Sequence, residues 1–197
     1  MTEPLWIENS GVVKEKLLKE PQTTREKWFE QRDDLTGEHS FGDAGQIIFA
    51  LLFFVIWIAD SFFLNYSTQL SDIVPAVVSK PIGILLLCLS AYCAWSGLRI
   101  VFGEVRETPS VIRKGVFGVV RHPIYLSEVL LYLGLFMLSM SLAAGAILLC
   151  ATAFLYYLSR YEERLLLKRF GDDYRSYAHQ VGMWIPRLRK NRRRDHA

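Results

Sequence analysis

Residues 124–159, "IYLSEVLLYLGLFMLSMSLAAGAILLCATAFLYYLS", form the longest apolar stretch of this 197-residue chain. A single α-helix of that length would measure about 54 Å, nearly twice the roughly 30 Å thickness of a bilayer's hydrocarbon core. The stretch must therefore turn back on itself. Small and hydroxyl residues gather in residues 139–145, where Gly145 permits unusual backbone angles. We predict a helical hairpin formed by residues 124–140 and 142–160.

Two earlier stretches are also long and apolar enough to cross a bilayer, residues 46–64 and 81–103. Pro81 suits the first turn of the second stretch, because proline needs no hydrogen-bond partner there. Hydrophobic residues make up 51% of the chain, which is more than one soluble core of this size requires. We therefore expect an all-α fold, a polytopic integral membrane helical bundle with about four transmembrane helices, including the C-terminal hairpin.

The remaining segments divide the chain further. Residues 1–45 carry many charges with apolar residues at helical intervals, and we expect a cytoplasmic amphipathic segment that packs on the protein or the membrane surface. Glu3 and Glu8 precede any apolar stretch, so we expect no cleaved signal peptide. Residues 46–103 hold the first two spans and residues 104–187 the catalytic half. Residues 188–197 form a basic tail that contacts anionic lipid or is simply solvated.

Basic residues set the predicted orientation. The connection over residues 104–123 is rich in Lys and Arg, whereas residues 65–80 contain only Lys80. Because basic loops stay on the cytoplasmic side, both termini are expected there, in a bacterial inner membrane or the endoplasmic reticulum. No aromatic residues interleave the basic tail, so we expect no nucleic-acid partner. Cys88, Cys93 and Cys150 lie in apolar runs and are expected to be buried thiols without a metal or redox role.

Polar residues interrupt the start of the third span. Pro123 fits the first position of a helix, and His122 before it is pushed toward an extended conformation. Arg121 and His122 would then lie beside free N–H groups at the positive end of a helix dipole, which attracts a carboxylate or phosphate. Glu128 falls inside the hydrocarbon zone, so it should face the bundle and have a partner or a function. Lipid anchoring by Arg121 and simple packing by Glu128 are the alternatives.

A second polar cluster follows the fourth span. Arg160, Glu162 and Glu163 should emerge at the level of Arg121 and His122, because the two helices form one hairpin. The carboxylates can stabilise a cation or accept hydroxyl protons from a ribose, and Arg160 can hold an anionic group. A solvated helix with (i, i+4) charge pairs is the alternative. Gly171 can end this helix, and the next one would present Tyr174 and Tyr177 on one face.

The two clusters together resemble a known family. "GVFGVVRHPIYL" at residues 115–126, followed by "EERLLLKRFGDDYRSYAHQVGMWIP" at residues 162–186, resembles the isoprenylcysteine carboxyl methyltransferase family and its phospholipid-methylating relatives. These are integral membrane enzymes that use S-adenosylmethionine. The resemblance covers residues 100–187 and rests on both motifs in order and at the family's spacing.

The resemblance implies a set of cofactor-binding residues. They come from the segment before the glycine turn, from the aromatic of that turn, from the His-Pro-x-Tyr element and from the first glutamate of the pair: Pro109, Ser110, Val111, Ile112, Phe117, His122, Pro123, Ile124, Tyr125 and Glu162. Arg160 is the nearest match to the family's substrate-binding arginine. Pro109 and Phe117 depart from the family pattern, which has histidine and tyrosine at these positions.

The chemistry of S-adenosylmethionine agrees with the residue types. Arg121 and His122 can hold its carboxylate, while Glu162 and tyrosines such as Tyr174 can face its sulfonium and ribose. In-line methyl transfer mainly requires alignment and exclusion of water. Arg160 would position a carboxylate acceptor, and Glu163 or Glu128 would take the proton from an amine acceptor.

The expected partners are a lipophilic small molecule or a lipidated substrate and the membrane lipid. Two other functions fit parts of the sequence. The Arg-His-Pro element also occurs in sterol reductases, which would use NADPH, and a non-enzymatic signalling or scaffolding protein would need only the four spans. The Glu-Glu-x-x-Leu sequence and the short chain favour the methyltransferase.

Overall fold

The computed structural model describes residues 40–103 and 110–187. The described residues form helices and loops, and the single β-bridge among them joins Val120 and Gly182. The expected amphipathic segment lies outside the described residues except for its last six positions, which form the start of the first described helix. The basic tail lies outside them as well.

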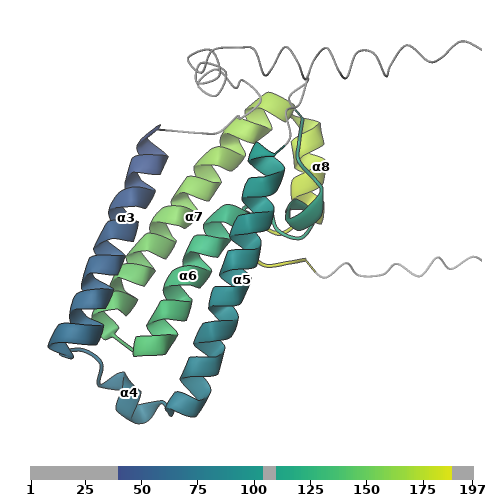
Figure 1. The fold of residues 1–197 in the computed structure, drawn as a ribbon. Coiled ribbons are helices and arrows are strands. Elements are labelled where there is room, and N and C mark those ends of the chain that lie inside the picture. Colours follow the sequence, from purple (N-terminus) through teal and green to yellow (C-terminus); the bar gives the residue numbers. More distant parts are fainter. Residues whose placement is uncertain (1–39, 104–109, 188–197) are drawn as a thin grey trace, which may run out of the picture. The chain divides into compact units, whose positions relative to one another are not determined.

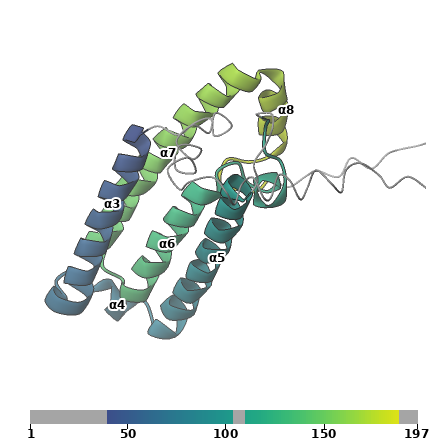
Figure 2. The same ribbon diagram turned by 45° about the horizontal axis from the view of Figure 1, so that its top comes forward.

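Four apolar helices make up the bundle, in agreement with the predicted all-α membrane fold (Figure 1). They are α3 (Ser40–Ile58), extended by the π-helix η1 (Ala59–Leu64), α5 (Ala76–Phe102), α6 (Pro123–Ser139) and α7 (Leu142–Phe170). Ala44–Leu64, α5 and α7 are each long and apolar enough to cross a membrane, whereas α6 has 17 residues. In Figures 1 and 2 the helices follow the order α3, α7, α6, α5 across the bundle.

The second span begins earlier than predicted. α5 starts at Ala76 with Pro75 as its N-cap, so Pro81 lies inside the helix and not in its first turn. Proline removes one backbone hydrogen bond and its ring crowds the carbonyl group four residues earlier, but a packed membrane helix tolerates this cost. Pro75 therefore marks the true start of the helix. At the other end of the bundle, α7 continues past the predicted span and ends at Phe170, so that Gly171 follows the helix as the sequence predicts.

The hairpin turn between α6 and α7 falls where the sequence predicts it. Met140 adopts the left-handed conformation with a φ of 54°, and Ser141 caps α7 by accepting a hydrogen bond from the Ala144 N–H. Gly145 is helical instead. A Cβ atom at Gly145 would lie 2.9 Å from the Phe136 ring, so this glycine serves the close approach of the two helices.

A buried carboxylate closes the end of the bundle where this turn lies. Asp60 is 4% exposed, and its oxygens accept hydrogen bonds from the Tyr66 and Ser67 N–H groups and from the Ser67 and Ser141 hydroxyls. These bonds join the loop after η1 to the hairpin turn. The carboxylate is fully hydrogen-bonded, as a buried charge must be.

Small side chains hold α5 against α6. The buried residues of α5 are all small, namely Ser79, Gly83, Ser90, Cys93 and Gly97. Such residues let membrane helices approach closely and gain van der Waals contact. Ser90 adds a hydrogen bond of 2.6 Å to the Ser127 carbonyl oxygen.

Replacing Gly83 with alanine should lower the free energy of unfolding by about 1–2 kcal/mol, because overpacking forces the helices apart. The added Cβ would lie 2.8 Å from Leu138 and 2.9 Å from the Gly134 carbonyl oxygen. The measurement is the melting temperature of the purified protein in one detergent. Ala91→Ser is the control, because it also adds one heavy atom but on the exposed face of α5. Equal melting temperatures for the two variants would contradict the close packing.

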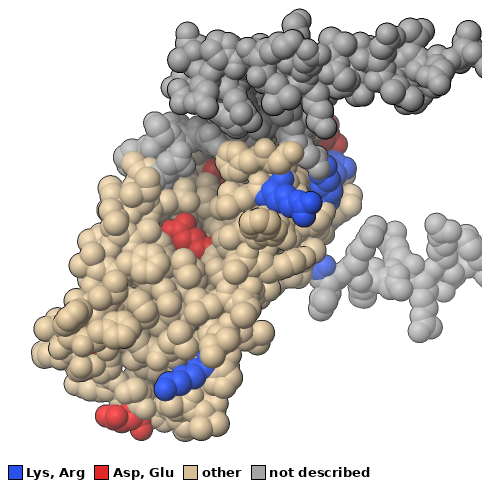
Figure 3. Space-filling view, viewed as in Figure 1, with Lys and Arg blue, Asp and Glu red and all other residues tan. Residues whose placement is uncertain are grey.

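Much of the bundle surface is apolar on the face shown in Figure 3, where charged side chains lie near both ends and one acidic patch lies between them. Large hydrophobic residues of α3 and α5, such as Leu51, Val55 and Leu85, are 61–68% exposed. Such a surface is what a bilayer covers. All three cysteines were expected to be buried. This is wrong for Cys88 and Cys150, which are exposed on this surface, and correct for Cys93. All three are free thiols.

Candidate functional site

The start of α6 has the predicted geometry. Pro123 occupies the first turn of the helix, and His122 is its N-cap with a φ of −122° and a ψ of 66°. The chain beyond α8 (Asp172–Gln180) pairs with this point, where the Arg121 N–H donates to the Gly182 carbonyl and the His122 N–H to the Met183 carbonyl. The backbone N–H groups of both residues are therefore used by the protein itself.

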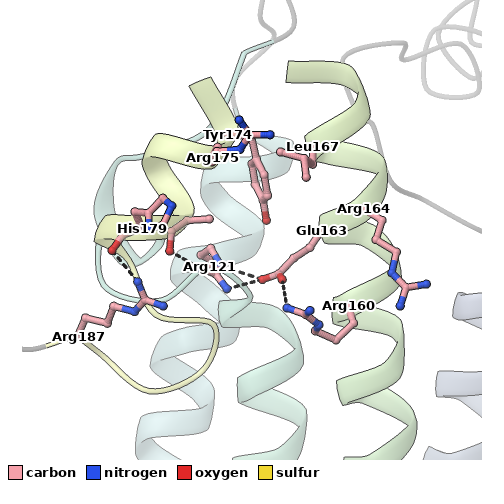
Figure 4. A pocket seen from close by; sticks show the side chains of 10 residues that line it. Arg121, Arg160, Glu163, Arg164, Leu167, Tyr174, Arg175, His179 and Arg187 are labelled. Carbon is pink, nitrogen blue, oxygen red and sulfur yellow. Dashed lines mark hydrogen bonds and ion pairs between the residues drawn. The ribbon is translucent and has the colours of Figure 1, made fainter. Parts of the chain in front are cut away.

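The hairpin brings Arg121 to Glu163, and both side chains are buried. The Arg121 Nε donates to Glu163 Oε1 at 2.8 Å, and its Nη2 lies 2.6 Å from the same oxygen. The Arg121 Nη1 donates to the carbonyl oxygens of Ala178 and Val181. Arg121 thus joins α7 to the end of α8 and the segment after it (Figure 4). The predicted proximity of the two polar clusters is confirmed.

The neighbouring acid, Glu162, faces α6. It accepts a hydrogen bond from the Tyr125 hydroxyl, and its Oε2 lies 3.5 Å from His122 Nδ1. The His122 and Tyr125 rings stack with their centroids 5.7 Å apart. Successive residues of a helix point about 100° apart, so the two glutamates serve different neighbours. Glu162 contacts the His-Pro-x-Tyr element, and Glu163 contacts Arg121.

Two buried polar atoms at this cluster make no hydrogen bond among the described residues. One is His122 Nε2, which lies 3.6 Å from Glu163 Oε1, and the other is the Tyr174 hydroxyl. His122 is 7% exposed and Tyr174 is 4% exposed. An unsatisfied buried polar group is costly, and it often marks a place where water or a ligand binds.

His122 lies between two acids, and this determines its charge. Burial lowers its pKa, but the carboxylates of Glu162 and Glu163 beside the ring outweigh that effect and raise the pKa above its ordinary value. The protonated imidazole therefore contributes to stability. Because the folded pKa is the higher one, the contribution is fully present below about pH 6.5 and is lost as the pH rises through the folded value.

The melting temperature of the protein is accordingly expected to fall as the pH rises from about 6.5 to 9. The His122→Asn variant should show a smaller fall, because it lacks the titrating group. The exposed His179 provides the control, and His179→Gln should keep the wild-type dependence. The same pH dependence in His122→Asn and in the wild type would contradict the assignment.

A pocket of about 290 Å³ opens beside Glu163, between α7, α8 and the segment after α8. Figure 4 shows its lining side chains, and we call it the arginine pocket. Its lining residues are five arginines, one acid and four others, namely Arg121, Arg160, Arg164, Arg175, Arg187, Glu163, Leu167, Tyr174, Ala178 and His179. Arg160 is half-exposed and donates to Glu163 Oε2 at 3.0 Å. The pocket is strongly positive and suits a negatively charged group.

Two tyrosines of α8 lie on one face of that helix, as predicted, and pack beside the pocket. Tyr174 and Tyr177 pack with Val181 and with Val111. The Tyr177 hydroxyl donates to the Phe117 carbonyl oxygen at 2.7 Å. Burial raises the pKa of Tyr177 to about 12 and that of Tyr174 further, so both are neutral hydroxyls. Tyr177 therefore holds the 3-10 turn η2 (Gly115–Gly118) in place.

The other predicted site residues lie at varying distances from this cluster. Pro123 and Ile124 face α5 at Gly97, and Ser110 is exposed. Glu128 lies deeper along α6 and has the expected partner, because it accepts a hydrogen bond of 2.5 Å from the Tyr132 hydroxyl. Pro109 lies outside the described residues. The roles assigned to all of these residues remain predictions.

Sequence reasoning missed six of the ten residues that line the arginine pocket. Arg164, Leu167, Arg175, Ala178, His179 and Arg187 were not singled out. The available signal was helical spacing, because residues 160, 164 and 167 share one face of α7, and residues 175 and 179 share one face of α8.

These features define a multi-pass α-helical membrane protein with a buried ionic cluster and a positive pocket at one end of a helical hairpin. The comparisons with known proteins add a likeness to a family. Residues 78–173 match the phospholipid methyltransferase family, and this match confirms the resemblance drawn from the two motifs. Neither a reductase nor a scaffold protein is favoured.

Two relatives are methanethiol S-methyltransferases. The protein of that name from Pseudomonas deceptionensis is 33% identical over 78 residues, which are 39% of this chain and 28% of the relative. Methanethiol S-methyltransferase 2 from Bradyrhizobium diazoefficiens is 34% identical over 107 residues, which are 53% of this chain and 38% of the relative. The chain therefore spans less than two fifths of the length of either relative. No solved structure matches.

Proposed function

We propose that this protein is an integral membrane methyltransferase that takes its methyl group from S-adenosylmethionine and transfers it to a lipophilic or lipid-like acceptor. The phospholipid methyltransferase match and the two methanethiol S-methyltransferases support methyl transfer. Residues 104–187 would form the donor-binding half, since they hold both motifs.

The observation that carries the proposal is a buried ring nitrogen beside the Arg121–Glu163 ion pair. His122 Nε2 makes no hydrogen bond among the described residues, and Glu162 lies next to His122. A molecule with hydroxyl groups, a carboxylate and a cationic centre offers partners of each required kind. S-adenosylmethionine has this combination, so the residues fit the donor.

We assign donor binding to His122, Tyr125 and Glu162. Glu162 has acceptor capacity beyond its bond from Tyr125, and it would accept protons from ribose hydroxyls or face the sulfonium. Phe117 and residues 110–112 would complete this wall. Arg121 acts as a positioning residue, because four hydrogen bonds and ion-pair contacts to Glu163, Ala178 and Val181 occupy most of its donors.

When bound, the donor supplies an activated methyl group on a sulfonium, which leaves as a neutral thioether. The protein then needs to orient the acceptor, exclude water and accept a proton where the acceptor carries one. Glu163, within reach of the pocket, would accept the proton from a thiol or amine. Glu128, partly exposed and within the apolar part of α6, would do so for an acceptor bound deeper in the bilayer.

The acceptor class follows from the same residues. The relatives' names favour a thiol, whereas the family name favours a phospholipid amine. The half-exposed Arg160 would position a carboxylate if the acceptor carries one. We also propose that both termini face the cytoplasm, because the four helices bring the start of α3 and the end of α7 to the same end of the bundle (Figure 1).

Equilibrium binding of radiolabelled S-adenosylmethionine to the purified full-length protein tests the proposal. We expect saturable binding that excess NADPH does not displace, and methylated product when membranes with the protein are supplied with candidate thiols and lipid amines. Binding of NADPH in place of S-adenosylmethionine would overturn the proposal in favour of a reductase, and binding of neither would leave a non-enzymatic protein.

A further inference from the structure

We propose that the arginine pocket is a binding site for a phosphate-type oxyanion, separate from the methyl-donor site. The anion would come from the headgroup of an acidic lipid or from dissolved phosphate. The inference rests on the charges, the hydrogen bonds and the depth of the pocket, and it does not require methyl transfer.

The pocket carries positive charge that the described residues do not neutralise. Arg121 and Arg160 share the carboxylate of Glu163, and Arg175 pairs with Asp172. Among the described residues, Arg187 donates only to the His179 carbonyl oxygen, which carries no net charge. Arg164 makes no hydrogen bond or ion pair within the described part of the chain. Within residues 40–103 and 110–187, the guanidinium charges of Arg164 and Arg187 therefore have no counterion, and guanidinium groups bind phosphate oxygens well.

A buried hydroxyl provides a second, independent indication of a ligand. The Tyr174 hydroxyl points into the pocket toward Glu163 and Arg121 (Figure 4), and it has no hydrogen-bond partner among the described residues. Its burial and raised pKa keep its proton in place. A neutral hydroxyl can donate to an oxyanion, so a bound phosphate group would satisfy this atom.

The depth of the pocket fits a lipid phosphate. Arg160 and Arg164 lie 18 and 22 residues after the start of α7 at Leu142. At 1.5 Å per residue these positions are about 27 and 33 Å along the helix, which is where the hydrocarbon core ends and the headgroups begin. The exposed Arg164 side chain can therefore reach lipid phosphates from the protein surface.

The proposed donor site is a different place. His122, Tyr125 and Glu162 face one another between α6 and α7, and none of the three lines the arginine pocket. The donor's sulfonium is a cation, which an excess of guanidinium charge would repel. A cation beside Glu162 and an anion among the arginines can be bound together.

The test uses the full-length protein in nanodiscs. In one arm the nanodiscs contain only phosphatidylcholine, and binding of dissolved inorganic phosphate is measured. In the other arm they contain phosphatidylglycerol as well, and native mass spectrometry measures the acidic lipid that stays bound. We expect Arg164→Gln/Arg187→Gln to weaken binding about tenfold or more, since charge-assisted hydrogen bonds are lost. The arm that shows binding identifies the source of the anion.

Lys168→Gln/Arg169→Gln is the matched control, because it removes two charges from α7 outside the pocket lining. It should leave anion binding within about twofold of the wild type, since exposed charges act weakly. Equal weakening by both double variants, or no anion binding in either arm, would overturn the proposal. Displacement of the anion by S-adenosylmethionine would also overturn it, because the pocket would then hold the donor's carboxylate. If S-adenosylmethionine binds but the anion does not, the anion site is refuted and the proposed function is not.

Discussion

Glu163→Ala is expected to lower the free energy of unfolding by about 3–5 kcal/mol, because it leaves the buried guanidinium of Arg121 without its counterion. The Arg121 and Glu163 side chains are 8% and 10% exposed, so water cannot replace the lost carboxylate. The same change removes an ion-pair partner from Arg160 and His122. Denaturant titration of the purified protein in one detergent measures the effect.

Two further variants show whether the uncompensated charge is the cause. Arg121→Met/Glu163→Leu removes both charges and should be more stable than Glu163→Ala, although the Ala178 and Val181 carbonyl oxygens lose their donor. Asp173→Ala breaks the exposed pair with Arg113 and should cost no more than about 1 kcal/mol. If Glu163→Ala lowers the free energy of unfolding by no more than Asp173→Ala does, the Arg121–Glu163 ion pair does not hold α8 to the hairpin.

Glu162→Gln is expected to weaken binding of S-adenosylmethionine about 10- to 100-fold, because an amide cannot replace the charge of a carboxylate or its full acceptor capacity. The fold should survive, since the glutamine oxygen can still accept the hydrogen bond from Tyr125. Binding of the radiolabelled donor gives the dissociation constant, and the melting temperature reports on the fold.

Asp173→Asn is the control for this prediction. It is the same carboxylate-to-amide change on the exposed face of α8, and it should leave donor binding unchanged. A second variant, His122→Ala, removes the ring that stacks on Tyr125 and should also lose donor binding while the protein still inserts in the membrane. Unchanged binding in both Glu162→Gln and His122→Ala would remove these residues from the donor site.

The candidate site could be predicted only in part. The proximity of Arg121 and His122 to Glu162 and Glu163 follows from the hairpin, because both clusters must leave the bilayer at the same end. Which residue each of the two acids contacts could not be predicted, because it depends on how α7 is rotated about its axis. In the structure that rotation directs Glu162 to Tyr125 and Glu163 to Arg121.

Helix boundaries were predictable where chemistry marks them and uncertain elsewhere. Pro123 marks the start of α6, as the sequence indicates, but Pro75 and Pro81 compete for the start of α5, and only the packed structure selects Pro75. The left-handed residue of the hairpin turn is Met140, although Gly145 is the residue that permits such angles most easily. Close packing against Phe136 requires the glycine in the helix.

The sequence by itself determined that the chain forms a membrane bundle of four apolar helices whose third and fourth members turn back on each other, because apolar length must match bilayer thickness. Only the tertiary structure decided that Arg121 serves Glu163 and α8, that Val120 pairs with Gly182, and that five arginines surround one pocket. These contacts join segments about 40 to 65 residues apart. Their formation depends on helix rotation and on the path of the chain after α8, and no local pattern encodes either.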